Sequence, residues 1–303
     1  MNTSVSEIGF GSWQLGSKGD NWSSMSEEDG IELVREAVKK GVTFFDTAPG
    51  YSSGNSELIL GKALKGLREN VYLNTKIGHG PNGEYEFTKK GISTSINRSL
   101  TKLQTSYLDS VILHNPDMSI LRGESTLFDI LSEYKEKGII RGFGVSIDSL
   151  HELQTVLDNI DVDVIEIMFN IIHQEPRYLF DKIKEKGILL IAKIPFDSGW
   201  LTGRFNKNST FNGIRSRWSS EVKETRSEII DIISKEIGSK NMINDALGYI
   251  LCYDAISTII PGTRTIKHLE GSIEASKVEF QISKKTQLEN LYESFIKDKD
   301  TPW

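Results

Sequence analysis

FFDTAPGYSSGNSE, residues 44–57, is the stretch that decides the fold of this chain. An apolar run, VTFF, leads into Asp46, and Tyr51 follows five residues later. Two further apolar runs end on an ionisable residue in the same way, VYLNTK on Lys76 and DSVILH on His114. The carboxyl ends of the strands in a parallel barrel share one mouth, so these four side chains are expected to converge there.

The whole chain repeats this alternation of apolar runs and amphipathic stretches at intervals of about 25 to 35 residues, as successive strand–helix units do. Eight apolar runs, most of them rich in β-branched and aromatic residues, are predicted to be buried parallel strands. The runs are SEIGFGSW (6–13), VTFFDTA (42–48), VYLNTKI (71–77), LDSVILHN (108–115), IRGFGVSI (140–147), VIEIMFN (164–170), ILLIAKIPF (188–196) and STIIPG (257–262).

The joints between helices and strands support this interpretation. Gly41, Gly138 and Gly187 each follow lysines at a predicted helix end and precede a strand, as left-handed helix caps do. A doubly wound sheet would usually carry a Gly-rich nucleotide turn after its first strand, and GFGSWQLG lacks that spacing. We therefore predict an α/β fold, a single eight-stranded parallel (β/α)8 TIM barrel domain over residues 1–303. KKTQLENLYESFIK, residues 284–297, is predicted to form an additional C-terminal helix.

The composition narrows the classes of partner. A formal charge of −6 without a long basic run argues against nucleic acid or a membrane surface. No stretch approaches the ~18–20 apolar residues of a membrane span. Cys252 is the only cysteine, so no internal disulfide is possible. We expect a cytoplasmic protein without a metal site, acting as a monomer or weak homo-oligomer.

The four convergent residues suit the reduction of an aldehyde or ketone. Tyr51 is the natural proton donor, but a phenol with a pKa of about 10 is a slow acid near neutrality. A cationic Lys76 would lower that pKa, and Asp46 would hold the lysine charged and oriented. His114 would orient the substrate oxygen. The hydride must come from a cofactor, because no side chain supplies one.

Each of these residues taken alone also has a plain structural interpretation, as a cap, a loop hydrogen bond or a solvated charge. A barrel lysine such as Lys76 could also form a Schiff base, as in an aldolase, although Asp46 would keep it charged and poorly nucleophilic. The convergence of all four on strand ends favours the reductase interpretation.

The sequence resembles the aldo-keto reductases over nearly its whole length. The motifs that carry the resemblance are GFGSWQLG (9–16), FFDTAPGYSSGNSE (44–57), NTKIG (74–78), LDSVILHNPD (108–117), IRGFGVSI (140–147), VDVIEIMFN (162–170), PFDSGWLTGRF (195–205) and STIIPGTRTIKHLEGSIEA (257–275). The resemblance implies a barrel that binds NADPH, with NADH possible, at the carboxyl-end mouth. It also implies a small-molecule carbonyl compound as the substrate.

The resemblance assigns roles to individual residues. Tyr51 matches the family's general acid, Lys76 and Asp46 its activating pair, and His114 its substrate-orienting residue. The other matched positions are expected to bind the cofactor. They are Ser12, Trp13, Asp46, Glu166 and Lys193 around the nicotinamide, Ser146 at its carboxamide, Pro195, Phe196, Ser198, Gly199 and Leu201 in the loop that receives the pyrophosphate, and Gly262, Thr263, Arg264, His268 and Ser272 at the adenosine end.

Several of these positions depart from the family pattern. Glu166 stands where a carboxamide-binding Gln is frequent, and Lys193 where many members stack a Tyr on the nicotinamide. Glu166 could accept from the carboxamide, or the two residues could form an ion pair with each other. At the adenosine end a frequent Arg is replaced by His268, and a frequent Glu-Asn pair by Gly271-Ser272.

The loops are expected to choose the substrate. Residues 197–220 interrupt the repeat and predict a binding segment or lid at the active-site face. An aromatic set suited to a sugar face or an apolar carbonyl compound is expected at the mouth, or in the packing of loops. Its members are Trp13, Trp22, Tyr85, Phe87 and Trp218. We expect a small or sugar-derived carbonyl compound. The same site could instead oxidise a sugar or alcohol, or belong to a cofactor-binding regulatory barrel with little turnover.

Overall fold

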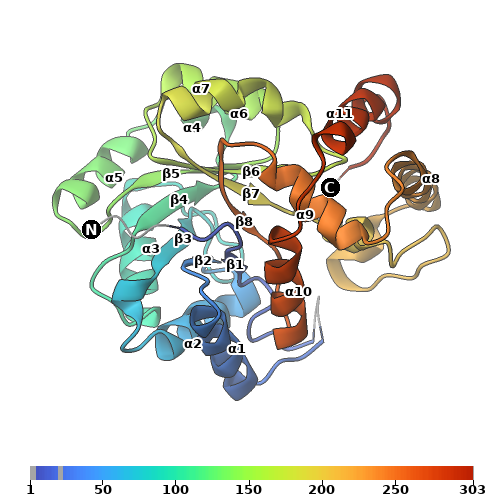
Figure 1. Ribbon diagram of the computed structural model, residues 1–303. Helices are drawn as coiled ribbons and strands as arrows, with labels where there is room; N and C mark the ends of the chain where they lie inside the picture. Colours follow the sequence, from blue (N-terminus) through green and yellow to red (C-terminus); the bar gives the residue numbers. More distant parts are fainter. Residues whose placement is uncertain (1–4, 20–22, 303) are drawn as a thin grey trace.

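The computed structural model describes residues 5–19 and 23–302, and it shows a ring of parallel strands surrounded by helices (Figure 1). The strands are β1 Phe10–Gly11, β2 Phe44–Thr47, β3 Tyr72–Ile77, β4 Ser110–His114, β5 Phe143–Ile147, β6 Val164–Met168, β7 Leu189–Lys193 and β8 Ile256–Ile260. Each strand pairs with the next one along the chain, from β1 to β8. Parallel bridges from Ile8 to Ile259 and from Gly11 to Gly262 join the first strand region to the last. The predicted eight-stranded α/β barrel is confirmed.

Helices cover the outside of the barrel (Figure 1). The α-helices are α1 Glu27–Lys39, α2 Asn55–Ala63, α3 Lys89–Lys102, α4 Met118–Leu121, α5 Leu127–Glu136, α6 Leu150–Asn159, α7 Phe180–Glu185, α8 Ser220–Glu236, α9 Met242–Leu251, α10 Ile266–Ser276 and α11 Ile282–Leu291. The predicted C-terminal helix is α11, which continues into a π-helical turn at Tyr292–Ile296. Within the described ranges, no helix combines the length and the apolar character needed to cross a bilayer.

The joints between helices and strands have the predicted geometry. Gly41, Gly138 and Gly187 have φ angles of 89°, 69° and 66°, a left-handed conformation that favours glycine. Each of the three follows the last turn of a helix, α1, α5 or α7, and comes shortly before a strand. The chain therefore turns from each helix into the next strand within a few residues, as a barrel of short strand–helix units requires.

Side chains inside the barrel lie in layers, because alternate residues of a strand point to the same side. The lower layer is apolar. It contains Phe44, Ile112, Val164, Ile191 and Ile260. Two positions further along four of these strands stand polar residues, which are Asp46, His114, Glu166 and Lys193. The apolar layer therefore lies directly below the polar residues of the mouth and separates them from the opposite end of the barrel.

Gly144 on β5 pairs with Val164 on β6. A Cβ atom at this position would lie 1.7 Å from the carbonyl oxygen of Val164. Because that oxygen belongs to the backbone of the paired strand, relief requires β6 to shift. We expect Gly144→Ala to lower the free energy of unfolding, measured in urea, by about 1–3 kcal/mol or more.

Gly271→Ala is the matched control for that experiment. Gly271 lies within α10, and no heavy atom lies within 4 Å of the Cβ that alanine would add. Alanine there is expected to leave stability unchanged or to raise it by up to about 1 kcal/mol. A Gly144→Ala protein as stable as the parent would show that the two strands separate without cost.

The segment 197–219, between β7 and α8, is irregular as predicted. Its two 3-10 turns are Asp197–Thr202 and Gly213–Arg217. Its first residue, Asp197, forms a buried ion pair with Arg226 of α8, whose Nε donates a hydrogen bond to Asp197 Oδ2 at 2.8 Å. Arg226 Nη2 also donates to the carbonyl oxygens of Thr301 and Pro302, at 3.2 Å and 3.1 Å. One guanidinium therefore joins the loop, α8 and the end of the described chain.

Candidate active site

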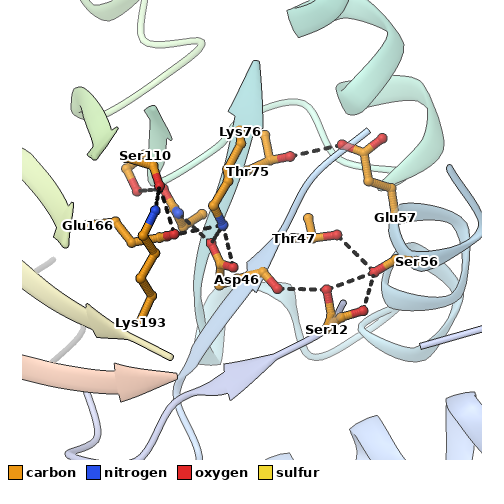
Figure 2. Close-up of polar contacts among 12 residues, drawn as sticks. Ser12, Asp46, Thr47, Ser56, Glu57, Thr75, Lys76, Ser110, Glu166 and Lys193 are labelled. Carbon is orange, nitrogen blue, oxygen red and sulfur yellow. Dashed lines mark hydrogen bonds and ion pairs between the residues drawn. The ribbon is translucent and has the colours of Figure 1, made fainter. Parts of the chain in front are cut away.

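Two neighbouring strands place opposite charges in contact at the barrel mouth. Asp46 on β2 and Lys76 on β3 are almost fully buried, and Lys76 Nζ lies 2.5 Å from each Asp46 carboxylate oxygen. Asn74 donates from Nδ2 to Asp46 Oδ1 at 2.8 Å, and its own Oδ1 accepts from Ser110 Oγ at 2.5 Å. The Asn74 amide therefore orients the Asp46 carboxylate. The carboxylate in turn orients the Lys76 ammonium (Figure 2). The contact of Asp46 with Lys76 was expected from the sequence, whereas Asn74 was not among the expected site residues.

Glu166 on β6 supplies a second carboxylate to the same lysine. Glu166 Oε2 lies 3.1 Å from Lys76 Nζ, and Oε1 accepts from Ser146 Oγ at 3.0 Å. Among the residues that the structure describes, Glu166 and Lys193 form no direct ion pair. Lys193 Nζ instead donates to Ser146 Oγ at 2.9 Å and lies 2.9 Å from Asp148 Oδ1. The alternative of a direct Glu166–Lys193 pair is therefore wrong, and Ser146 bridges the two residues.

This cluster of charges shifts the ionisation of its members. Burial raises the pKa of Asp46 and Glu166 raises it further, while Lys76 opposes the shift. Burial acts to lower the pKa of Lys76, but Asp46 and Glu166 outweigh it and raise that pKa above its ordinary value. Lys76 therefore remains an ammonium ion shared by two carboxylates.

Tyr51 begins a 3-10 turn, Tyr51–Gly54, shortly after β2. Lys76 Nζ lies 5.3 Å from the centroid of the Tyr51 ring. Burial raises the pKa of Tyr51 above its ordinary value, and Lys76 opposes this, whereas Asp46 and Glu166 add to it. Lys76 acts to lower the pKa of Tyr51 as expected, but the pKa stays above its ordinary value because burial and two carboxylates outweigh one ammonium.

His114, the last residue of β4, lies near Tyr51 at the barrel mouth. Its ring centroid lies 6.3 Å from that of Tyr51, with the ring planes nearly perpendicular at 88°. Burial, then Lys76, Lys193 and His79, lower the pKa of His114 well below its ordinary value, so the imidazole is neutral near pH 7. A neutral imidazole offers one N–H donor to a ligand oxygen.

His79 is a mouth residue that sequence analysis missed. Its ring centroid lies 5.9 Å from that of His114 and 5.1 Å from that of Phe87. It follows the end of β3 by two residues, a strand-end position like those that drew attention to Lys76 and His114. That position was the available signal.

The residues expected to bind a cofactor differ in accessibility. The buried ones are Ser12, Asp46, Ser146, Glu166, Lys193, Pro195, Leu201, Thr263 and Ser272. The others keep part of their surface accessible, and they are Trp13, Phe196, Ser198, Gly199, Gly262, Arg264 and His268. The hydroxyl of Ser12 donates to Asp46 O at 2.6 Å and lies 2.7 Å from Ser56 Oγ, so the protein itself engages it (Figure 2).

Cations gather at the expected adenosine end. Arg264 follows β8 and donates from Nη2 to Ser23 O at 3.3 Å, while its Nε is buried with no hydrogen-bond partner among the described residues. Burial and then Arg264 lower the pKa of Arg215. Burial and then Arg204 and Arg264 lower the pKa of His268. A buried, unpaired donor in a positive field fits an anionic group such as a phosphate.

Two of the aromatic residues expected at the mouth are accessible there. Trp13 lies with its ring centroid 6.2 Å from that of Tyr51. Tyr85 is 59% exposed, and its hydroxyl donates to Asp117 Oδ2 at 3.0 Å. Trp22 lies outside the described residues.

The other two aromatic residues pack loops. Phe87 is buried and lies edge-on to His79. Trp218 is buried with its ring centroid 5.9 Å from Trp200 and 5.0 Å from Phe211. For Phe87 and Trp218 the loop-packing interpretation therefore describes the contacts.

Comparisons with known proteins give one family. The chain matches the model of the aldo/keto reductase family over residues 7–293. It is 28% identical over 308 residues to the aldo-keto reductase YhdN of Bacillus subtilis (strain 168), across 97% of this chain and 92% of the relative. It is 27% identical over 248 residues to the NADH-specific methylglyoxal reductase of Escherichia coli (strain K12), across 76% of each. The solved holo form of the aldo-keto reductase AKR11C1 from Bacillus halodurans shares the fold, with a TM-score of 0.81, 23% identity and coverage of 98% of this chain and 96% of that one. The chain thus belongs to the aldo/keto reductase family of NAD(P)H-dependent oxidoreductases.

Proposed function

We propose that this chain reduces a small or sugar-derived aldehyde or ketone to the alcohol, with a hydride from NADPH and a proton from Tyr51. The observation that carries the proposal is the buried Asp46–Lys76 pair beside the Tyr51 phenol at the barrel mouth. Family membership supports carbonyl reduction in general. The roles of individual residues are proposed from their geometry.

In the proposed reaction a hydride adds to the carbonyl carbon, and the carbonyl oxygen takes up a proton. The nicotinamide supplies the hydride when it is bound. Tyr51 gives its phenol proton to the oxygen, and Lys76 stabilises the phenolate that remains. An alkoxide is a much stronger base than a phenolate, so the transfer stays favourable although the pKa of Tyr51 is raised. His114, being neutral, donates its N–H to the same oxygen and orients it.

Assays in both directions test the proposal. Aldehydes, ketones and sugars are offered with NADPH or NADH, and the corresponding alcohols with NADP+ or NAD+. We expect reduction to be faster than oxidation near neutral pH. Faster oxidation would mean that the enzyme is a dehydrogenase using Tyr51 phenolate as its base. Tight cofactor binding without turnover in either direction would favour a regulatory barrel.

We propose NADPH as the preferred cofactor because of Arg264. Its buried Nε, which has no hydrogen-bond partner within residues 5–19 and 23–302, and the neighbouring cations suit the additional phosphate of NADPH. NADH remains the alternative, since one relative carries NADH specificity in its name.

Arg264→Gln is expected to raise the Kd for NADPH about tenfold or more, because charged hydrogen bonds contribute about 1.5–3 kcal/mol. The Kd for NADH should change much less. Cofactor fluorescence titration measures both constants. Lys277→Gln is the control, because this exposed cation at the end of α10 pairs with Glu274 instead. An equal loss of affinity for NADPH and NADH would mean that Arg264 binds a group that both cofactors contain.

A further inference from the structure

Glu166 gives the candidate active site an unusual charge balance. Lys76 Nζ lies within 3.1 Å of carboxylate oxygens from both Asp46 and Glu166, and all three side chains are at most 2% exposed. Glu166 Oε1 accepts a hydrogen bond from Ser146, whereas Oε2 forms an ion pair with the Lys76 ammonium and has no hydrogen-bond partner among the described residues. The buried cluster of Asp46, Lys76 and Glu166 therefore carries two negative charges and one positive charge when all three are ionised (Figure 2).

This cluster lies against Tyr51. Lys76 of β3 lies 5.3 Å from the centroid of the Tyr51 ring, and His114 of β4 lies edge-on to that ring. The other charged or titratable groups contact these two or lie nearby: Asp46 of β2 and Glu166 of β6 on Lys76, His79 beside His114, and Lys193 paired with Asp148. A phenolate at Tyr51 would add a negative charge to a buried cluster that already has one in excess. In an enclosed site that charge is poorly screened, so the phenol form is favoured.

We propose that Glu166 is a positioning residue that shares Lys76 with Asp46 and thereby keeps Tyr51 in its proton-donating phenol form. The inference rests on the proposed function. Reduction needs the phenol as its acid, whereas oxidation of an alcohol needs the phenolate as its base. Glu166 therefore lowers the fraction of phenolate that is available as the base for alcohol oxidation near neutral pH.

Glu166→Gln tests this inference, because the amide has nearly the same shape and lacks the charge. In alcohol oxidation we expect the ionisation that controls kcat to move to lower pH by about one unit. At a pH below that ionisation, oxidation should become about tenfold faster than in the parent, since one unit changes the phenolate fraction tenfold. The pH profile is a readout that a purely space-filling role would not move.

Two further variants separate this role from others. Asp148→Asn removes an equal charge where it contacts Lys193 and not Lys76, and it should leave the ionisation near its parental pH. Glu166→Asp keeps a carboxylate, so its ionisation should stay closer to that of the parent than the Glu166→Gln ionisation does. An equal shift in Asp148→Asn would overturn the inference. A Glu166→Gln protein with altered cofactor Kd and an unmoved pH profile would also overturn it, and would assign Glu166 to the cofactor.

A second measurement does not depend on turnover. The near-ultraviolet absorbance of Tyr51 phenolate is obtained by subtracting the titration of Tyr51→Phe from that of the parent. The same difference is taken between Glu166→Gln and the double variant Glu166→Gln/Tyr51→Phe. The phenolate should appear at lower pH without the Glu166 charge, and an unchanged titration would refute the inference. A parent without any turnover would instead refute the proposed function, and this titration would still decide the role of Glu166.

Discussion

Tyr51→Phe is expected to lower kcat for carbonyl reduction by about 10²–10⁴-fold, the usual contribution of a positioned general acid. The change removes the phenol proton and keeps the ring, which packs near Trp13 and edge-on to His114. Because the Asp46–Lys76 pair is unaltered, the fold and the cofactor Kd should remain close to those of the parent. Single-turnover kinetics, together with fluorescence titration of NADPH, measures the two effects separately.

Tyr85→Phe is the matched control, since it deletes a hydroxyl from another tyrosine at the mouth. Tyr85 is 59% exposed and bonds Asp117, so its variant should reduce carbonyl compounds at nearly the parental rate. Near-parental turnover by Tyr51→Phe would mean that another group delivers the proton. His114, which faces Tyr51, would then be the next residue to test.

The part of this site that can be predicted from sequence is the part that lies on neighbouring strands. Asp46 and Lys76 both close an apolar run, and β2 and β3 are consecutive, so strand ends and adjacency predict their contact. Asn74 is in register with Asp46 and lies two residues before Lys76. The alternation of side chains along a strand would have placed it on the same inner face.

The contact between Glu166 and Lys76 could not be predicted from strand adjacency. The sequence suggested Lys193 on the adjacent strand β7 as the ion-pair partner of Glu166, because a linear pattern indicates contacts only between neighbouring strands. In the structure Glu166 reaches across the barrel interior to Lys76 on β3. An eight-stranded barrel is narrow enough for side chains of non-adjacent strands to meet, and this depends on the closed ring rather than on any local motif.

The ion pair of Asp197 and Arg226 was unpredictable for a related reason. Arg226 is a cation within a helix, where charges are usually solvated, and nothing in its neighbourhood in the sequence marks it as buried. Its burial follows from three separate segments, the start of the 197–219 loop, α8 and the end of the described chain, meeting at one place. A residue that joins segments far apart in the chain should matter greatly for stability.

Arg226→Met is therefore expected to lower the free energy of unfolding by about 3–5 kcal/mol, because it leaves the carboxylate of Asp197 buried without its main partner. Urea denaturation measures the loss. Lys207→Met is the control, since Lys207 pairs with Glu224 at 3.4 Å on the surface and its loss should cost at most about 1 kcal/mol. Adding Asp197→Asn to Arg226→Met should recover part of the loss, because the stranded charge is then gone.

The pH dependence gives this prediction a second test. Burial acts to raise the pKa of Asp197, but His173 and Arg226 outweigh it and lower that pKa to about 2. The folded state therefore holds the proton less tightly than the unfolded chain, whose Asp pKa is about 3.9. The stabilisation is complete above that value and is lost as the pH falls toward 2. Arg226→Met should remove the part of this acid-dependent loss that Arg226 causes, while His173, 3.4 Å from Asp197 Oδ1, keeps the rest, so parent and variant should approach each other in stability at low pH. A stability difference that stayed constant over this range would show that Arg226 acts through packing on Trp218 and through the carbonyl groups of the tail, and not through the charge of Asp197.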